Sequence, residues 1–133
     1  MDGKELQIGN YIEAFGVKRI VAGIFGSQDM MMLDTYIPSL GYRESTLSFR
    51  CEYANPIPLT KDILEKNFGQ QRAKGGLFYH YIGSNGICDY IIEYYQENFG
   101  FCRDHGGLLC RIKYFHQLQN AMRVCGIDKD IVL

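Results

Sequence analysis

Four side chains in the last third of the chain are suited to metal chemistry: Cys102, His105, Cys110 and His116. A structural zinc site needs four thiolate or imidazole ligands, usually as two close pairs with about two to four residues between the members of each pair. Cys102 and His105 fit one such pair, but the chain has no second pair, and Cys110 lies in an apolar run typical of a buried strand. We therefore expect no metal site and no other cofactor.

Covalent catalysis would draw on Cys102, Asp104 and His105, which supply a thiol, a carboxylate and an imidazole. Residues this close along the chain rarely face one another productively, and the chain has no Gly-x-Ser-x-Gly turn or Walker loop. Asp89 and Glu93 recur on one side of an expected strand, which a solvated strand face also explains. The sequence assigns no catalytic residue and favours a non-enzymatic protein.

A row of hydrogen-bonding side chains follows one side of the last expected helix: His116, Gln119, Asn120 and Arg123. The amides and the imidazole can bind a base or a ribose, and a guanidinium group can bind a phosphate. Polar rows are also common on surface helices simply because that side is in water.

Tyrosine is unusually frequent, since the chain has ten Tyr and eight Phe but no Trp. Phenol rings stack on bases and present a polar hydroxyl, although strands also select aromatic residues for packing. Combining these rings with the helical row predicts a ligand-binding set composed of Tyr79, Tyr81, Tyr90, Tyr94, His116, Asn120 and Arg123.

Alternating apolar residues and turn signals predict the strands that would carry these side chains. Gly26–Asp29 and the Asn85-Gly86 pair are the expected hairpin turns, and residues 35–45 read as irregular. The expected strands cover residues 5–15, 19–25, 30–33, 47–53, 77–82, 87–97 and 108–112, with a further short strand between 98–100 and 104–107.

Two helices are expected. Thr60 offers a hydroxyl as N-cap for a short helix that Gly69 ends, and a final helix begins near Tyr114 and ends at Gly126. Residues 69–76 read as a polar, mobile loop.

Runs of strands with few helices favour an α+β fold, with a mostly antiparallel small sheet or partly open barrel and two short helices, one of them near the C-terminus. At 133 residues the chain fits a single domain covering residues 1–133. Exposed strand edges make a homo-oligomer conceivable.

The charge balance of 14 basic and 15 acidic residues, a net charge of −1, argues against nucleic acid as a partner. The sequence shows neither a signal peptide nor an apolar run of membrane-spanning length, so we expect no membrane partner. Five cysteines, an odd number, fit reduced thiols inside a cell.

Three blocks of the chain carry a resemblance. They are Leu6-Gln7-Ile8-Gly9-Asn10-Tyr11-Ile12, then Pro56-Ile57-Pro58-Leu59-Thr60, and finally Tyr114-Phe115-His116-Gln117-Leu118-Gln119-Asn120. In this order they resemble a family of small uncharacterised proteins of gut-bacterial phages and mobile elements. The chain departs from the family pattern at Phe115 and after Asn120. The resemblance implies a phage or mobile-element accessory protein and supplies no catalytic residue.

We therefore expect a non-enzymatic protein that binds and sequesters a small nucleotide-derived ligand to counter host defence. Two alternatives stay open: a protein-interaction module that inhibits a host defence protein, and a small nucleic-acid-binding barrel.

Overall fold

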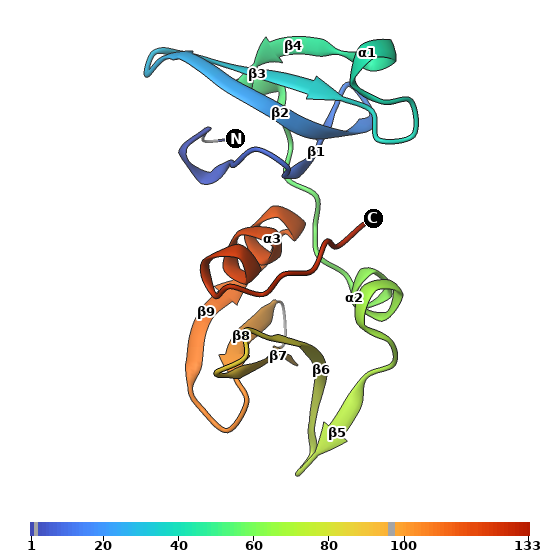
Figure 1. The fold of residues 1–133 in the computed structure, drawn as a ribbon, viewed down its shortest axis with the longest axis vertical. Helices are drawn as coiled ribbons and strands as arrows, with labels where there is room; N and C mark the ends of the chain where they lie inside the picture. Colours follow the sequence, from blue (N-terminus) through green and yellow to red (C-terminus); the bar gives the residue numbers. More distant parts are fainter. Residues whose placement is uncertain (2, 96–97) are drawn as a thin grey trace. The chain divides into compact units, whose positions relative to one another are not determined.

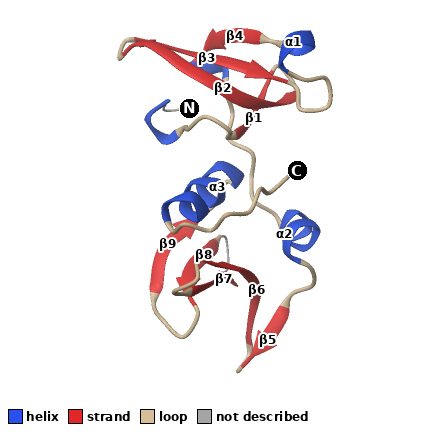
Figure 2. Ribbon diagram, in the orientation of Figure 1, coloured by secondary structure: helices blue, strands red, loops and turns tan. Residues whose placement is uncertain are grey.

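The computed structural model describes residues 1, 3–95 and 98–133. The chain forms two compact units, Met1–Ile57 and Pro58–Leu133. Each unit has its own antiparallel sheet, and neither sheet closes into a barrel (Figure 1, Figure 2). The predicted α+β class is confirmed. The prediction of one domain over residues 1–133 stays a prediction.

The first unit is a four-stranded meander in which each strand pairs with the next along the chain. Its strands are β1 (Tyr11–Ala14), β2 (Val17–Ser27), β3 (Met30–Tyr36) and β4 (Leu47–Arg50), with the 3-10 turns η1 (Gly3–Glu5) and η2 (Cys51–Tyr53) and the short helix α1 (Tyr42–Ser45).

Alternation along these strands places one set of side chains in the core of the first unit. Ile12, Val21 and Leu33 are completely buried, and Leu6, Ala14, Phe49, Cys51 and Ala54 join them. The predicted turn at Gly26–Asp29 joins β2 to β3. Gly26 has a φ of 102°, and a Cβ there would clash with the Met30 carbonyl oxygen, so glycine is required at this position.

The predicted strand over residues 5–15 is shorter in the structure and begins only at Tyr11. Gly9 has a φ of 94°, which breaks the extended backbone. Asn10 is completely buried, and its Oδ1 accepts a hydrogen bond of 2.8 Å from the Gln7 N–H. The Leu6–Ile12 block therefore forms a turn that feeds β1, with Ile8 left exposed.

Residues 35–45 are more regular than predicted, because β3 extends to Tyr36 and α1 covers Tyr42–Ser45. Ser45 organises this connection: its Oγ accepts from the Ile37 N–H at 2.8 Å and donates to the Gly41 carbonyl at 2.6 Å. Side-chain hydroxyls that bond nearby backbone in this way stabilise turns, and this one requires tertiary context to form.

The second unit is a five-stranded antiparallel sheet with two helices. Figure 1 shows α3 beside β9 and the C-terminal segment running back towards α2. The elements are α2 (Lys61–Phe68), β5 (Arg72–Lys74), β6 (Leu77–Ser84), β7 (Asp89–Tyr94), β8 (Phe99–Arg103), β9 (Leu108–Ile112) and α3 (Phe115–Val124).

The predicted mobile loop at 69–76 is wrong in part, because Arg72–Lys74 form β5 and pair with Tyr79, Phe78 and Leu77 of β6. Gly75 and Gly76, with φ values of 59° and 83°, make the tight turn between the two strands. This hairpin brings Arg72 onto the sheet, next to Tyr79.

Both predicted helices are present, and α2 begins after its predicted N-cap, Thr60. Thr60 Oγ1 accepts from the Ile63 N–H at 3.2 Å, and Gly69 ends α2 with a φ of 81°. Together, the helices and one face of the sheet enclose the core of the second unit. Its completely or almost completely buried residues are Leu64, His80, Ile82, Ile92, Phe101, Ile112, Phe115, His116, Leu118 and Met122.

Candidate functional site

Strand register divides the tyrosines of the second sheet between its two faces. Paired residues of an antiparallel sheet share a face, and neighbours along one strand point to opposite faces. Tyr79 pairs with Glu93, whereas His80 pairs with Ile92 and Tyr94 with Phe99. Tyr79 and Tyr81 therefore lie on the face opposite to the one that carries Tyr90 and Tyr94.

Tyr90 and Tyr94 belong to the face that forms the core. The Tyr90 ring is buried and stacks on Phe101, with ring centroids 5.5 Å apart. The Tyr94 hydroxyl lies 2.5 Å from Nε2 of the buried His80. Burial raises the pKa of Tyr94 and lowers that of His80. These contacts give both phenols a packing role.

The helical row of the sequence prediction also divides in the structure. His116 is 1% exposed and stacks on Tyr114 at 6.0 Å, so it lies in the core rather than in water. Asn120 is half-buried and Arg123 is exposed on α3. Gln119 is half-buried like Asn120, so His116 is the one residue of this row that is removed from solvent.

The opposite face of the sheet, called the outer face below, carries a row of paired residues that crosses all five strands. Arg72 pairs with Tyr79, Tyr79 with Glu93, Glu93 with Gly100, and Gly100 with Arg111. A second row beside it is made by Tyr81, Ile91, Cys102 and Leu108. The outer face thus combines phenols with a guanidinium group at each end of one row.

At one end of the outer face, Arg72 lies over a tyrosine. Its Cζ is 5.6 Å from the centroid of the Tyr81 ring. The Tyr81 hydroxyl donates to Asp89 Oδ1 at 2.7 Å, and this hydrogen bond raises the pKa of Tyr81. The phenol is therefore held in a fixed orientation with a cation on its face.

At the other end, Arg111 lies over Tyr95, with its Cζ 4.5 Å from the ring centroid, and Arg111 Nη1 donates to Asn98 Oδ1 at 3.1 Å. The Tyr95 ring lies over Gly100, where a Cβ would clash with Cε2 of the ring. Glycine at position 100 is what lets an aromatic ring cover this part of the sheet.

Two apolar side chains lie beneath these rings. Ile91 and Cys102 are buried although they belong to the outer face. Burial, with a smaller contribution from Glu93, raises the pKa of the Cys102 thiol to about 11. Cys102 is therefore protonated at neutral pH and has neither the thiolate nor the exposure that a nucleophile needs.

On the outer face the structure brings together two predicted site residues, Tyr79 and Tyr81, whereas Asn120 and Arg123 reach solvent on α3. The sequence reading missed their neighbours Arg72, Tyr95 and Arg111. Tyr95 could have been found, because it follows Tyr94 directly and must point the other way in an extended chain. Arg72 could be named from the sequence as a cation able to contact a phosphate, but its place beside Tyr79 could not, because residues 69–76 were predicted to be a loop.

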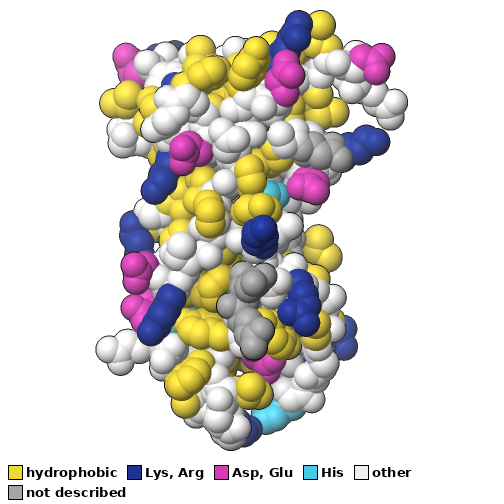
Figure 3. Space-filling view, turned by 180° about the vertical axis from the view of Figure 1, so that it is seen from behind, with side chains coloured by type: hydrophobic (Ala, Val, Ile, Leu, Met, Phe, Trp, Pro, Cys, Tyr) yellow, Lys and Arg dark blue, Asp and Glu magenta, His cyan; other side chains and the backbone are white. Residues whose placement is uncertain are grey.

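The lower half of Figure 3 shows the second unit from behind, and side chains of different types are mixed on this surface. Hydrophobic side chains alternate there with Lys and Arg side chains rather than forming one apolar patch. On the outer face itself, carboxylates Asp89 and Glu93 stand between the two arginines. A polyanion would meet these carboxylates, whereas a small ligand with hydroxyl or amino donors could bond them.

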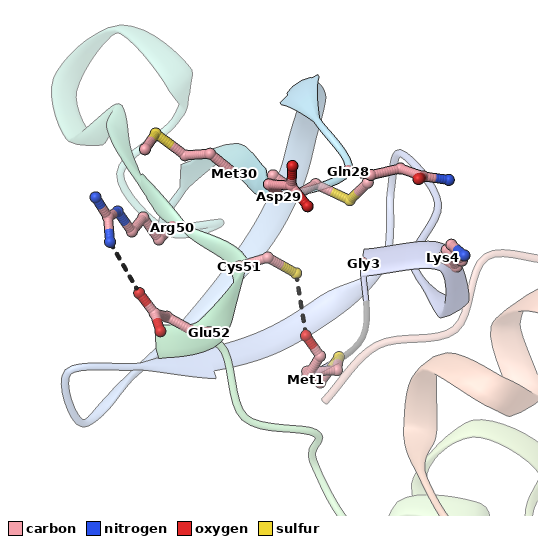
Figure 4. Close-up of a pocket in the computed structure, with 10 residues that line it drawn as sticks. Met1, Gly3, Lys4, Gln28, Asp29, Met30, Arg50, Cys51 and Glu52 are labelled. Carbon is pink, nitrogen blue, oxygen red and sulfur yellow. Dashed lines mark hydrogen bonds and ion pairs between the residues drawn. The ribbon is translucent and has the colours of Figure 1, made fainter.

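The first unit contains a separate pocket of about 300 Å³ at the β2–β3 turn. Figure 4 shows Cys51 donating from Sγ to the Met1 carbonyl at 3.4 Å and the Arg50–Glu52 ion pair at 3.5 Å. Four sulfur-containing residues line it, namely Met1, Met30, Met31 and Cys51, together with Lys4, Asp29, Arg50 and Glu52.

In the described part of the chain, no three His, Cys, Asp or Glu side chains come close enough together to hold a metal ion. Cys102 and His116 are buried, whereas His105 is exposed in the turn after β8. None of the five cysteines forms a disulfide bond. Across residues 1, 3–95 and 98–133, no helix has the length and apolar character needed to cross a membrane.

Comparison of the chain with protein-family models, with curated proteins and with solved structures finds no match. The resemblance to the family of phage and mobile-element proteins stays a prediction. The function of the chain has to be argued from its own residues.

Proposed function

We propose that this chain is a non-enzymatic accessory protein of a phage or mobile element that sequesters a small nucleotide-derived ligand in the cytoplasm of a bacterial host. Such sequestration would remove a signal on which host defence depends. One observation carries the ligand class: the outer face presents Arg72 over Tyr81 and Arg111 over Tyr95, with Tyr79 between them.

Each part of a nucleotide has a partner on this face. A base can stack on a phenol ring, because every base offers a π face. A guanidinium group pairs with a phosphate through two parallel N–H donors. Asp89 and Glu93 can accept hydrogen bonds from ribose hydroxyls or base amino groups, which is how carboxylates hold ribose in other nucleotide sites.

Charge favours a small ligand over a nucleic acid. The net charge is −1, and a protein that binds polynucleotides needs cations at many phosphates. Here the two arginines of the row are separated by a carboxylate, Glu93. A ligand with one or two phosphates can meet one arginine and avoid the carboxylate, but a continuous phosphate backbone cannot.

Isothermal titration calorimetry with a panel of mononucleotides, cyclic dinucleotides and ADP-ribose tests the proposal. A member of the panel should bind, and Arg72→Gln or Arg111→Gln should weaken its affinity at least about tenfold, the effect of losing roughly 1.4 kcal/mol of a charge-assisted contact. Arg43→Gln, on the exposed helix α1, is the matched control and should change nothing.

Other outcomes have distinct meanings. If Arg123→Gln abolishes binding while both outer-face variants bind normally, the ligand lies on α3 and the outer-face assignment is wrong. If no nucleotide binds and the purified chain instead retains one host protein in stoichiometric amount through the outer face, sequestration is refuted in favour of the protein-interaction alternative.

A further inference from the structure

Two sulfur atoms converge in the first unit, far along the chain from one another. Gly3 lies against Met31 of β3 and Cys51 of η2. A Cβ at position 3 would be 3.2 Å from Cys51 Sγ and would clash with Met31 Sδ. Both sulfurs therefore lie beside the Gly3 backbone, and the Met31 side chain fills the space that a side chain at position 3 would need.

The surroundings of these two sulfurs are a pocket rather than a sealed core. Cys51 is 5% exposed, but Met31 is only half-buried, and both line the 300 Å³ pocket at the β2–β3 turn (Figure 4). Met30, which is half exposed, lines the same pocket. An ion can thus reach the sulfurs from solvent. Sulfur atoms that only pack a core would need no such access.

Thiolate and thioether sulfur are soft ligands, and soft ligands select Cu(I) over the harder divalent ions. We propose that the first unit binds Cu(I) between Cys51 Sγ and Met31 Sδ, at the pocket that both residues line. The proposal is independent of any nucleotide bound by the second unit.

The charge balance suits this position. Binding requires Cys51 to lose its thiol proton to solvent, and the hydrogen bond from Sγ to the Met1 carbonyl is lost with it. The thiolate and the monovalent ion then form a neutral pair, which burial penalises far less than a single charge. No electron is transferred, because copper is supplied and held as Cu(I).

The test uses the full chain with its three accessible cysteines replaced, as Cys88→Ser, Cys110→Ser and Cys125→Ser together, so that they cannot bind copper. Titration without oxygen into the coloured Cu(I)–bicinchoninate complex should remove one equivalent of Cu(I) per chain. Adding Cys51→Ser should abolish this transfer, and adding Met31→Leu should weaken it at least tenfold. Met32→Leu, one residue along β3 and facing the opposite side, is the matched control and should leave it unchanged.

A second measurement keeps the proposal testable if Cys51→Ser fails to fold. In the chain labelled with 13C at its methionine methyl groups, Cu(I) should shift the Met31 signal and leave the Met32 signal in place. Failure to compete with bicinchoninate overturns the proposal. The proposal is also overturned if the protein still takes Cu(I) from bicinchoninate after Cys51→Ser. It is overturned as well if Cu(I) uptake depends on Cys51 but is unchanged by Met31→Leu, since one thiol is not the two-sulfur site.

Discussion

The side-chain Oε1 of Gln117 accepts a hydrogen bond of 3.0 Å from the backbone N–H of Tyr114, three residues earlier. The same oxygen accepts from the Lys113 N–H at 2.8 Å. One side chain thus satisfies two backbone donors at the start of α3, the role that Glu or Gln has at the third position of a capping box. The conspicuous glutamine of the last sequence block is explained by folding.

Replacing Gln117 with Leu should therefore destabilise the second unit. Two backbone N–H groups would lose their acceptor, and we expect the free energy of unfolding to fall by about 1–2 kcal/mol, the range of a lost helix cap. Urea unfolding followed by circular dichroism measures this change. Gln117→Glu keeps a side-chain acceptor oxygen at the same place, so its free energy of unfolding should fall by less than half as much. Equal losses in the two variants would contradict the capping explanation.

The other two sequence blocks have structural explanations as well. In the first, Asn10 closes a buried turn before β1. In the second, the Leu59 N–H donates to the Lys113 carbonyl at 2.9 Å, and Thr60 caps α2. The three sequence blocks therefore mark where strands and helices begin. Because folding explains these residues, the blocks do not locate a ligand site.

Local signals predicted the features that depend on local physics. Thr60, Gly69, Gly26 and the Asn85-Gly86 turn act through the backbone of their own few residues, and all are where the sequence placed them. Asn85 shows this most directly, since its Oδ1 accepts from the backbone N–H groups of Ile87 and Cys88, both at 2.9 Å. Turn chemistry of this kind is readable from sequence.

Features that depend on long-range packing could not be predicted from the sequence. His116 is a polar residue on a polar row, yet the position of α3 buries it. Arg72 reaches the outer face only because β5 pairs with β6. The face on which each tyrosine lies follows from strand register, and one residue of slip would exchange the two faces.

Stability of the second unit should fall in mild acid because of His80. Burial lowers the His80 pKa below its usual value of 6.5, so the folded protein binds this proton less readily than the unfolded chain. The contribution of neutral His80 is complete above about pH 6.5 and is lost as the pH falls towards the lowered pKa. Glu65 and the Gly69 backbone oppose the shift, whereas Lys61 adds to it.

Urea unfolding at pH values between 7.5 and 5 measures this dependence. His80→Gln cannot take up the proton, so the difference in unfolding free energy between the original chain and the variant should shrink as the pH falls. His105→Gln, at an exposed position, is the control and should parallel the original chain. A difference that stays constant over the whole pH range would show that His80 does not titrate in this window.

The five cysteine thiols, none of them in a disulfide bond, should differ sharply in reactivity. Cys102 is 2% exposed with a pKa of about 11, against an ordinary value of 9.0, so at pH 8 its thiolate fraction is about a hundredfold below that of an ordinary thiol. Cys51 is also buried, whereas Cys110 is exposed and should react faster than Cys51 and Cys102, even though burial raises the pKa of its thiol.

Iodoacetamide labelling at pH 8, followed by mass spectrometry of peptides, measures these rates. Cys51 and Cys102 should be labelled only after denaturant is added. Labelling of Cys102 at the rate of Cys110 in the folded chain would mean that the outer face opens at Tyr95 and exposes the sulfur. The original chain in denaturant serves as the reference for full labelling.

The C-terminal segment is attached to α2 through hydrogen bonds of Asn67, Lys66 and Lys129, with Lys66 Nζ donating to the Leu133 carbonyl. Asn67 Nδ2 donates to the Val132 carbonyl at 2.7 Å, and Asn67 Oδ1 accepts from the Val132 N–H at 2.8 Å. Lys129 Nζ also donates to the Asn67 carbonyl at 2.7 Å. These bonds hold Ile131, which is 5% exposed, in the core of the second unit.

Asn67→Ala should therefore release residues 128–133. Losing both side-chain bonds and part of the burial of Ile131 should lower the free energy of unfolding by about 1–3 kcal/mol. Hydrogen exchange read by mass spectrometry should show faster exchange of the Val132 amide than in the original chain. Lys61→Ala, in the same helix, removes only the exposed pair with Glu65 at 3.8 Å and should change stability by less than about 0.5 kcal/mol. Unchanged exchange at Val132 in Asn67→Ala would mean that the Asn67 amide bonds contribute nothing measurable, and that burial of Ile131 and the bonds of Lys66 and Lys129 hold the segment.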